Sequence, residues 1–178
     1  MKILLDEEQL RAGVRRLAAE INDYYGEAGL TIIGVLTGSI ILLADLIRQL
    51  NGPLRVGLVQ ARSYRGGQTS PGPLAINADF LPDVKGRDVL LVDDIFDTGH
   101  TLLELLSQID ELGPSRVRTA VLLRKRGRQQ VSMTPDYVGF EIPDEFVVGY
   151  GLDYDGLFRN LPYVAGLEAH EKAKEHLA

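Results

Sequence analysis

Residues 89–102 have the sequence VLLVDDIFDTGHTL, in which an apolar run ends at two adjacent aspartates and a polar loop leads into a helix. The successive N–H groups and hydroxyls of such a loop, placed at a helix N-terminus, suit a phosphate monoester. Asp93 and Asp94 would repel a phosphate, and they suit a diol or a Mg²⁺ ion instead. The stretch therefore predicts a strand, loop and helix whose ligand carries phosphate, hydroxyls and a metal together.

The sequence on both sides of this unit alternates strands with helices. Apolar and β-branched runs predict strands at 31–36, 54–62, 88–92 and 118–123. Apolar residues at helical spacing predict a first helix, capped by Asp6 and interrupted at Gly26, and further helices at 40–50 and 100–112. This alternation predicts an α/β fold with a central parallel sheet flanked by helices, whose ligands bind at the carboxyl ends of the strands.

Two stretches interrupt the alternation. Residues 63–79 are too long and too rich in Gly and Pro for a simple connection, and they predict a flexible lid loop. Alternating apolar and polar residues at 136–151 predict short strands in a small hood over the sheet, and the charged tail at 168–178 predicts a surface helix. With no repeat or linker, we expect one domain over 1–178, with a core at about 28–130 and a hood at about 1–10 and 131–166.

Composition narrows the class of protein. At 178 residues with 45% hydrophobic residues, the chain can bury a core of ordinary size. The absence of cysteine excludes disulfides, thiolate nucleophiles and cysteine-based metal sites. The net charge of −6 argues against general affinity for nucleic acid. No apolar run approaches the ~20 residues that cross a bilayer, so we expect a cytoplasmic protein without a membrane partner.

Two regions resemble a known family. Residues 89–102 resemble the PRPP-binding motif of type I phosphoribosyltransferases, where PRPP is phosphoribosyl pyrophosphate. Residues 136–154, DYVGFEIPDEFVVGYGLDY, and 158–164, FRNLPYV, are similar to the base-binding hood of hypoxanthine-guanine phosphoribosyltransferases. The resemblance implies the type I fold and a Mg²⁺-dependent purine-salvage enzyme that turns PRPP and hypoxanthine or guanine into IMP or GMP and pyrophosphate. It also implies a homodimer or homotetramer.

The resemblance also assigns roles to individual residues. Asp97 would be the catalytic base, and the ribose and 5-phosphate would be held by Asp93, Asp94, Asp97, Thr98, Gly99, His100 and Thr101. Pyrophosphate would contact Leu36, Thr37, Gly38, Ser39 and Arg159, with a cis peptide between Leu36 and Thr37. The purine would contact Lys125, Phe146, Val147 and Asp153. The metal would be bound by Asp93, Asp94 and Asp153, and Ser63 and Tyr64 would close the lid. Many relatives carry Lys in place of Thr37, and several carry Lys in place of His100.

Chemistry supports part of this assignment, and other interpretations compete with it. The ammonium of Lys125 suits a 6-oxopurine and is mismatched to the 6-amino group of adenine. Without the resemblance, the basic run 124–128 would be a solvated turn and Phe146 a core residue. A response-regulator-like acidic pocket would explain Asp93 and Asp94 but not the phosphate loop. A xanthine-preferring phosphoribosyltransferase and a non-enzymatic, nucleotide-binding regulator on the same fold are the alternative functions.

Overall fold

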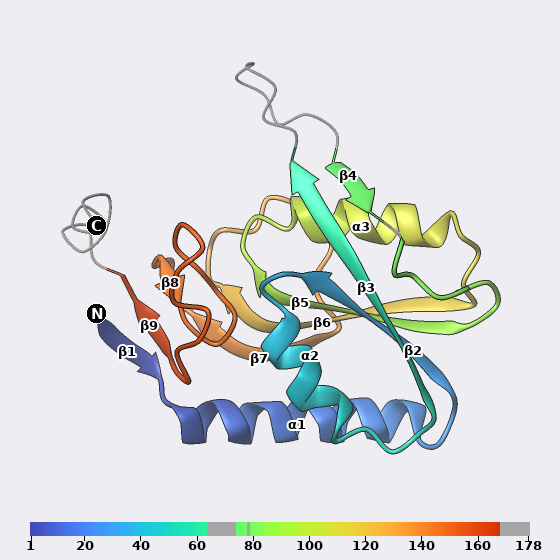
Figure 1. Cartoon of the computed structure of the whole chain (residues 1–178), viewed down its shortest axis with the longest axis horizontal. Helices are drawn as coiled ribbons and strands as arrows, with labels where there is room; N and C mark the ends of the chain where they lie inside the picture. The colour runs from blue at the N-terminus through green and yellow to red at the C-terminus, as the bar shows by residue number, and fades with distance from the viewer. Residues whose placement is uncertain (64–73, 78, 168–178) are drawn as a thin grey trace.

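The computed structural model describes residues 1–63, 74–77 and 79–167, which form two sheets and three helices (Figure 1). The helices are α1 (Glu7–Tyr25), α2 (Ile40–Ile47) and α3 (His100–Asp110). The main sheet contains β2 (Leu30–Leu36), β3 (Leu54–Ser63), β4 (Leu74–Asn77), β5 (Asp88–Phe96), β6 (Arg116–Lys125) and β7 (Tyr137–Ile142). The smaller sheet contains β1 (Lys2–Leu5), β8 (Val147–Val148) and β9 (Val164–Gly166).

The main sheet has the predicted parallel character. Its strand order is β4-β3-β2-β5-β6-β7, and all neighbours pair in parallel except β4, which runs antiparallel to β3 at the edge. Parallel strands bring their carboxyl ends to one edge of the sheet, which is where ligands bind in this architecture. The ends of β2, β5 and β6 therefore meet where the predicted site residues lie.

Helices cover both faces of the main sheet, as predicted (Figure 1). Successive residues of β2 point to opposite faces: Ile32 packs with α1 and α2, whereas Ile33 packs with α3. Both side chains are fully buried. These strands are apolar throughout because both of their faces are covered.

Helix α1 begins and ends where the sequence predicts. The side chain of Asp6 accepts from the N–H of Gln9 at 2.8 Å, and Gln9 Oε1 accepts from the N–H of Asp6 at 2.9 Å. This capping box satisfies two N–H groups that an α-helix otherwise leaves unpaired. Gly26 ends the helix with a φ of 59°, which only glycine adopts at little cost.

Several boundaries differ from the prediction. Strand β5 continues to Phe96 because Ile95 and Phe96 still pair with Leu123 and Arg124 of β6, so Asp93 and Asp94 belong to the strand itself. Strand β6 likewise extends to Lys125, which is held by pairing with Ile142 of β7. Helices α2 and α3 are shorter than the predicted 40–50 and 100–112.

The hood boundary needs a correction. Strand β7, predicted as part of the hood at 131–166, pairs with β6 and belongs to the main sheet, because its alternating pattern fits a sheet edge. The separate sheet consists of β1, β9 and β8, so the first strand of the chain pairs with the last described strand (Figure 1). Strand β4 lies within the predicted lid at 63–79, while Tyr64 and the tail helix predicted at 168–178 lie outside the described residues. No helix within the described ranges is long and apolar enough to cross a bilayer.

Candidate active site

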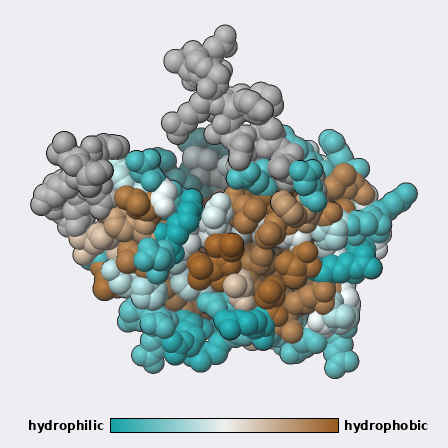
Figure 2. Space-filling model, in the orientation of Figure 1, coloured by the Kyte–Doolittle hydropathy of each residue, from teal (hydrophilic) through white to brown (hydrophobic). Residues whose placement is uncertain are grey.

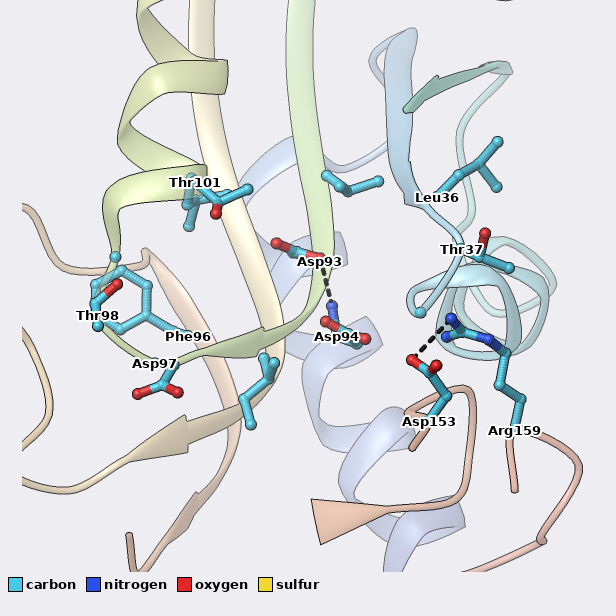
Figure 3. A pocket seen from close by; sticks show the side chains of 15 residues that line it. Leu36, Thr37, Asp93, Asp94, Phe96, Asp97, Thr98, Thr101, Asp153 and Arg159 are labelled. Carbon is cyan, nitrogen blue, oxygen red and sulfur yellow. Dashed lines mark hydrogen bonds and ion pairs between the residues drawn. The ribbon is translucent and has the colours of Figure 1, made fainter. Parts of the chain in front are cut away.

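A pocket of about 330 Å³ opens at the carboxyl ends of β2 and β5. Its walls come from four segments: the end of β2, the end of β5, the start of α3 and the loop that carries Asp153 and Arg159. In Figure 3, Asp93 and Asp94 lie in the middle, with Thr98 and Thr101 on one side and Leu36 and Thr37 on the other. The fold therefore brings together residues that are more than 120 positions apart in the sequence.

The paired aspartates form the negative centre of this pocket. Asp93 is 8% exposed, and its Oδ1 accepts from the N–H of Asp94 at 2.9 Å. Burial and the negative charge of Asp94 raise the pKa of Asp93 well above its ordinary value. Burial also raises the pKa of Asp94, although hydrogen bonds and the charge of Arg159 oppose this effect. A buried carboxylate and a partly buried one side by side are stabilised by a cation or by hydroxyl donors.

The turn after β2 lies against these carboxylates. The peptide bond between Leu36 and Thr37 is cis, as the resemblance implied. A Cβ at Gly38 would lie 1.5 Å from Asp94 Oδ2, so only glycine allows the turn to approach so closely. Leu36, Thr37 and Gly38 all line the pocket.

Ser39 does not contribute to the pocket in the way the sequence suggested. The side chain is fully buried, and both its hydroxyl and its N–H donate to the carbonyl oxygen of Val35, at 2.6 Å and 3.3 Å. These donors are therefore already used within the turn. Ser39 shapes the entry into α2 instead of offering a donor to an anion.

The loop at the start of α3 forms the opposite wall. Thr98, Gly99 and Thr101 line the pocket, and Gly99 has a φ of 91° at the N-cap of α3. This arrangement places a helix N-terminus beside two hydroxyls, as an anion site requires. His100 is exposed, and its Nε2 lies 3.2 Å from Gln130 Oε1, so its ring is engaged outside the pocket wall.

Asp97 lines this pocket and also contacts Lys125, one of the residues predicted to bind the purine. Its Oδ2 accepts from Lys125 Nζ at 3.2 Å. Lys125 is 9% exposed, Val147 is buried, and the ring of Phe146 is 40% exposed, with its edge against Tyr154 at 5.6 Å between ring centroids. A buried ammonium can bind a polar edge of a flat heterocycle, and a partly exposed aromatic ring can cover its face.

Asp153 and Arg159 pair on the Leu36 side of the pocket. Arg159 Nη2 lies 2.8 Å from Asp153 Oδ1, and Arg159 Nη1 donates to the carbonyl oxygen of Gly151 at 2.6 Å (Figure 3). Asp153 thus lies on the predicted pyrophosphate side, not beside Lys125. Asp93, Asp94 and Asp153 line one pocket, but within the described residues no three acidic or histidine side chains converge as one metal-binding group.

Sequence reasoning missed two partners of Asp97 and Lys125. Arg128 Nε lies 2.9 Å from Asp97 Oδ1, and Asp144 Oδ1 lies 3.5 Å from Arg128 Nε and 3.8 Å from Lys125 Nζ. The sequence feature that could have indicated these partners is the basic run at 124–128, whose Lys125 and Arg128 contact Asp144 of the predicted hood. The run is therefore a paired network rather than a solvated turn.

We expect Gly151→Ala to lower the free energy of unfolding by about 2–4 kcal/mol, as overpacking and a disallowed backbone conformation add together. Gly151 has a φ of 100°, and a Cβ there would lie 2.1 Å from the carbonyl oxygen of Gly38. The new methyl group would push the Arg159 loop away from the turn after β2. Urea unfolding gives the free energy from the shift of the midpoint at constant slope.

The matched control is Gly156→Ala. Gly156 has a φ of 80°, and a Cβ there would meet nothing within 4 Å. This variant shares the backbone cost of about 1–2 kcal/mol and lacks the collision. If both substitutions lowered the free energy of unfolding equally, the close approach of Gly151 to Gly38 would contribute nothing to the loss of stability.

Comparisons with known proteins agree with this geometry. The phosphoribosyl transferase domain family matches residues 1–155. A hypoxanthine-guanine phosphoribosyltransferase of Aquifex aeolicus is 42% identical over 169 residues, which cover 94% of this chain and 95% of the relative. The crystal structure of a hypoxanthine-guanine phosphoribosyltransferase from Bacillus anthracis, with HEPES in its active site, has a TM-score of 0.89 at 36% identity and covers 94% of this chain and 99% of the other. A Trypanosoma cruzi hypoxanthine phosphoribosyltransferase mutant, in a ternary complex with substrates, has a TM-score of 0.89 at 38% identity and covers 96% of each chain. The chain belongs to the phosphoribosyltransferase family and, within it, to the hypoxanthine-guanine phosphoribosyltransferases.

Proposed function

We propose that the protein transfers the 5-phosphoribosyl group of PRPP to hypoxanthine or guanine, giving IMP or GMP and pyrophosphate. The observation that carries the proposal is one pocket lined by the paired carboxylates of Asp93 and Asp94, by a helix N-terminus with two hydroxyls, and by Asp97, which contacts the buried ammonium of Lys125. These three features match the hydroxyls, the phosphate and the base of one nucleotide. A site that binds only an anion would not need all three features.

PRPP binding follows from the two walls of the pocket. Thr98, Gly99 and Thr101 offer N–H groups and hydroxyls to the 5-phosphate at the start of α3. Asp93 and Asp94 accept hydrogen bonds from the ribose hydroxyls, which lessens the cost of keeping the Asp93 carboxylate buried. Arg159 and the backbone of Thr37 and Gly38 receive the pyrophosphate on the far side.

The donor set also fits Mg²⁺. Asp93 and Asp94 present adjacent oxygen ligands. Burial and then the charge of Asp94 raise the pKa of Asp93, and a divalent cation relieves the repulsion between the two carboxylates. Asp153, on the pyrophosphate side, would hold a second ion together with the leaving group. When bound, Mg²⁺ supplies charge neutralisation for the pyrophosphate.

Proton transfer falls to Asp97. The bond from the anomeric carbon to a purine imidazole nitrogen forms as the bond to pyrophosphate breaks, and the proton lost from the imidazole passes to the Asp97 carboxylate. Burial tends to raise the pKa of Asp97, but hydrogen bonds from Arg128 and Lys125 outweigh it and lower that pKa. Asp97 is therefore ionised, and able to accept, at neutral pH.

Base selection falls to Lys125, Phe146 and Val147. The Lys125 ammonium has donors only, so it pairs with a 6-oxo group and leaves the 6-amino group of adenine without an acceptor. The exposed ring of Phe146 offers a stacking surface. Buried Val147 in β8 offers backbone groups at the base edge.

We also propose a homodimer or homotetramer in the cytoplasm. Hydrophobic side chains gather on the surface over α2 and β3 (Figure 2), where Ile40, Ile41 and Val56 are exposed. Clustered apolar side chains of this kind are typical of protein interfaces. The lack of cysteine suits a reducing compartment. Sedimentation of wild type and of an Ile40→Lys, Val56→Lys double variant would reveal whether this face holds copies together.

The deciding experiment is a spectrophotometric assay with PRPP, Mg²⁺ and each purine base in turn. We expect hypoxanthine and guanine to be used well ahead of xanthine and adenine, and chelation by EDTA to stop the reaction until Mg²⁺ is restored. Fastest use of xanthine would select the xanthine-preferring alternative. Binding of IMP or GMP by calorimetry without any transfer would select the nucleotide-binding regulator.

A further inference from the structure

Four side chains form a closed ring of alternating charge at the base side of the pocket. Asp97 contacts Lys125 at 3.2 Å and Arg128 at 2.9 Å, and both cations contact Asp144, at 3.8 Å and 3.5 Å. The ring joins the loop after β5, the end of β6, the turn that follows it and the turn before β8. Only Lys125, 10% exposed, is buried; the exposed fractions of the other three side chains are 34–49%.

The ring occupies both oxygens of the Asp97 carboxylate. Lys125 Nζ donates to Oδ2 and Arg128 Nε donates to Oδ1. Lys125 is buried and is needed for the purine 6-oxygen in the proposed reaction. Arg128 is the exposed, replaceable partner. An imidazole N–H that approaches Asp97 therefore competes with the guanidinium of Arg128 for Oδ1.

Asp144 is placed to receive that guanidinium. The same Arg128 Nε that donates to Asp97 already lies within 3.5 Å of Asp144 Oδ1, so a small rotation of an exposed side chain exchanges one carboxylate for the other. Asp144 also lies two residues before Phe146, on the segment that meets the purine ring. Charge is conserved within the ring during the exchange, because one ion pair replaces another.

We propose that Arg128 is a positioning residue, which holds Asp97 in the ligand-free protein and passes to Asp144 when the purine binds, leaving one oxygen of Asp97 for the imidazole N–H. This inference rests on the proposed function and adds a specific exchange step to it. The charged groups that face Asp97 are Lys125 and Arg128; Asp144 stands behind both, and His100, on α3, is engaged with Gln130.

Two variants with opposite expected effects test the exchange. Arg128→Gln removes the competitor of the purine, so the KM for hypoxanthine should fall several-fold while the KM for PRPP stays constant. The acid limb of the pH profile of kcat/KM should move to higher pH, because Arg128 no longer lowers the pKa of Asp97. Asp144→Asn removes the receiving group, so the KM for hypoxanthine should rise several-fold.

Arg126→Gln is the matched control. Arg126 loses the same charge in the same turn, but its guanidinium pairs with Glu141 and has no contact with Asp97. We expect its KM values and pH profile to equal those of wild type. A purely structural ring would shift the KM for hypoxanthine in one direction in both ring variants, and that result would overturn the proposal.

A carboxyl ¹³C NMR titration of Asp97 separates this inference from the proposed function. It needs no activity: the pKa of Asp97 in the ligand-free protein should rise in Arg128→Gln and stay unchanged in Arg126→Gln. An inactive wild-type protein with this NMR difference would contradict the proposed function and leave the ring intact. If the wild-type protein is active but the pKa of Asp97 is the same in wild type and in Arg128→Gln, the result would contradict the inference alone.

Discussion

Asp97→Asn should lower turnover by roughly 10²- to 10⁴-fold, the range for a lost general base, while PRPP binding stays close to that of wild type. The amide keeps the shape of the carboxylate but cannot accept the imidazole proton. It also leaves Lys125 and Arg128 with Asp144 as their shared counter-ion. Steady-state kinetics with saturating PRPP and hypoxanthine give the turnover, and calorimetry gives the PRPP affinity.

Asp144→Asn is the matched control for this prediction. It removes the same charge from the same ring, but Asp144 does not line the pocket, so its effect on turnover should be much smaller. The contribution of Asp97 to turnover should persist as pH falls through the ordinary carboxylate range, because the pKa of Asp97 is lowered and the base stays ionised, whereas Asp93, whose pKa is raised by burial and by the charge of Asp94, is protonated first. Unchanged turnover in a folded Asp97→Asn protein would remove this residue from the mechanism.

The secondary structure was predictable where one local rule decided it. The capping box of Asp6 and Gln9 predicts the start of α1. The nearly continuous apolar run of β2 indicates a strand that is buried on both faces. The predicted strand boundaries were wrong where pairing with a neighbouring strand decided them. Asp93 and Asp94 interrupt the apolar pattern, yet pairing with β6 carries β5 through both of them to Phe96. Strand β7 was assigned to the hood because sequence alone does not say which sheet an alternating strand joins.

The site was predictable where its residues are neighbours in the sequence. The residues from Asp93 to Thr101 supply most of one pocket wall from a single short segment. The ring through Arg128 and Asp144 depends on contacts between residues that are 16 to 31 positions apart, and no local spacing encodes them. The hydrogen bond of the Ser39 hydroxyl could not be predicted, because it depends on how the turn closes onto Val35.

Lys125→Ala should reduce kcat/KM for hypoxanthine and guanine by about 10- to 10²-fold, because a charge-assisted hydrogen bond of about 1.5–3 kcal/mol to the 6-oxygen is lost. The KM for PRPP should change little, since Lys125 lies outside the pocket wall that holds the phosphates. Kinetics with each substrate varied in turn separate the two effects. Discrimination against adenine should weaken as well, because the donor mismatched to its 6-amino group is gone.

Arg126→Ala supplies the control for this substitution. It removes one positive charge from the neighbouring position, but the Arg126 side chain is 69% exposed and pairs with Glu141, so only long-range electrostatics change. We therefore expect nearly wild-type use of both substrates. If Lys125→Ala instead weakened PRPP binding as strongly as purine use, its ammonium would have to be reassigned to the phosphates. The contacts of Lys125 with Asp97 and Asp144 would then serve only to hold the loops together.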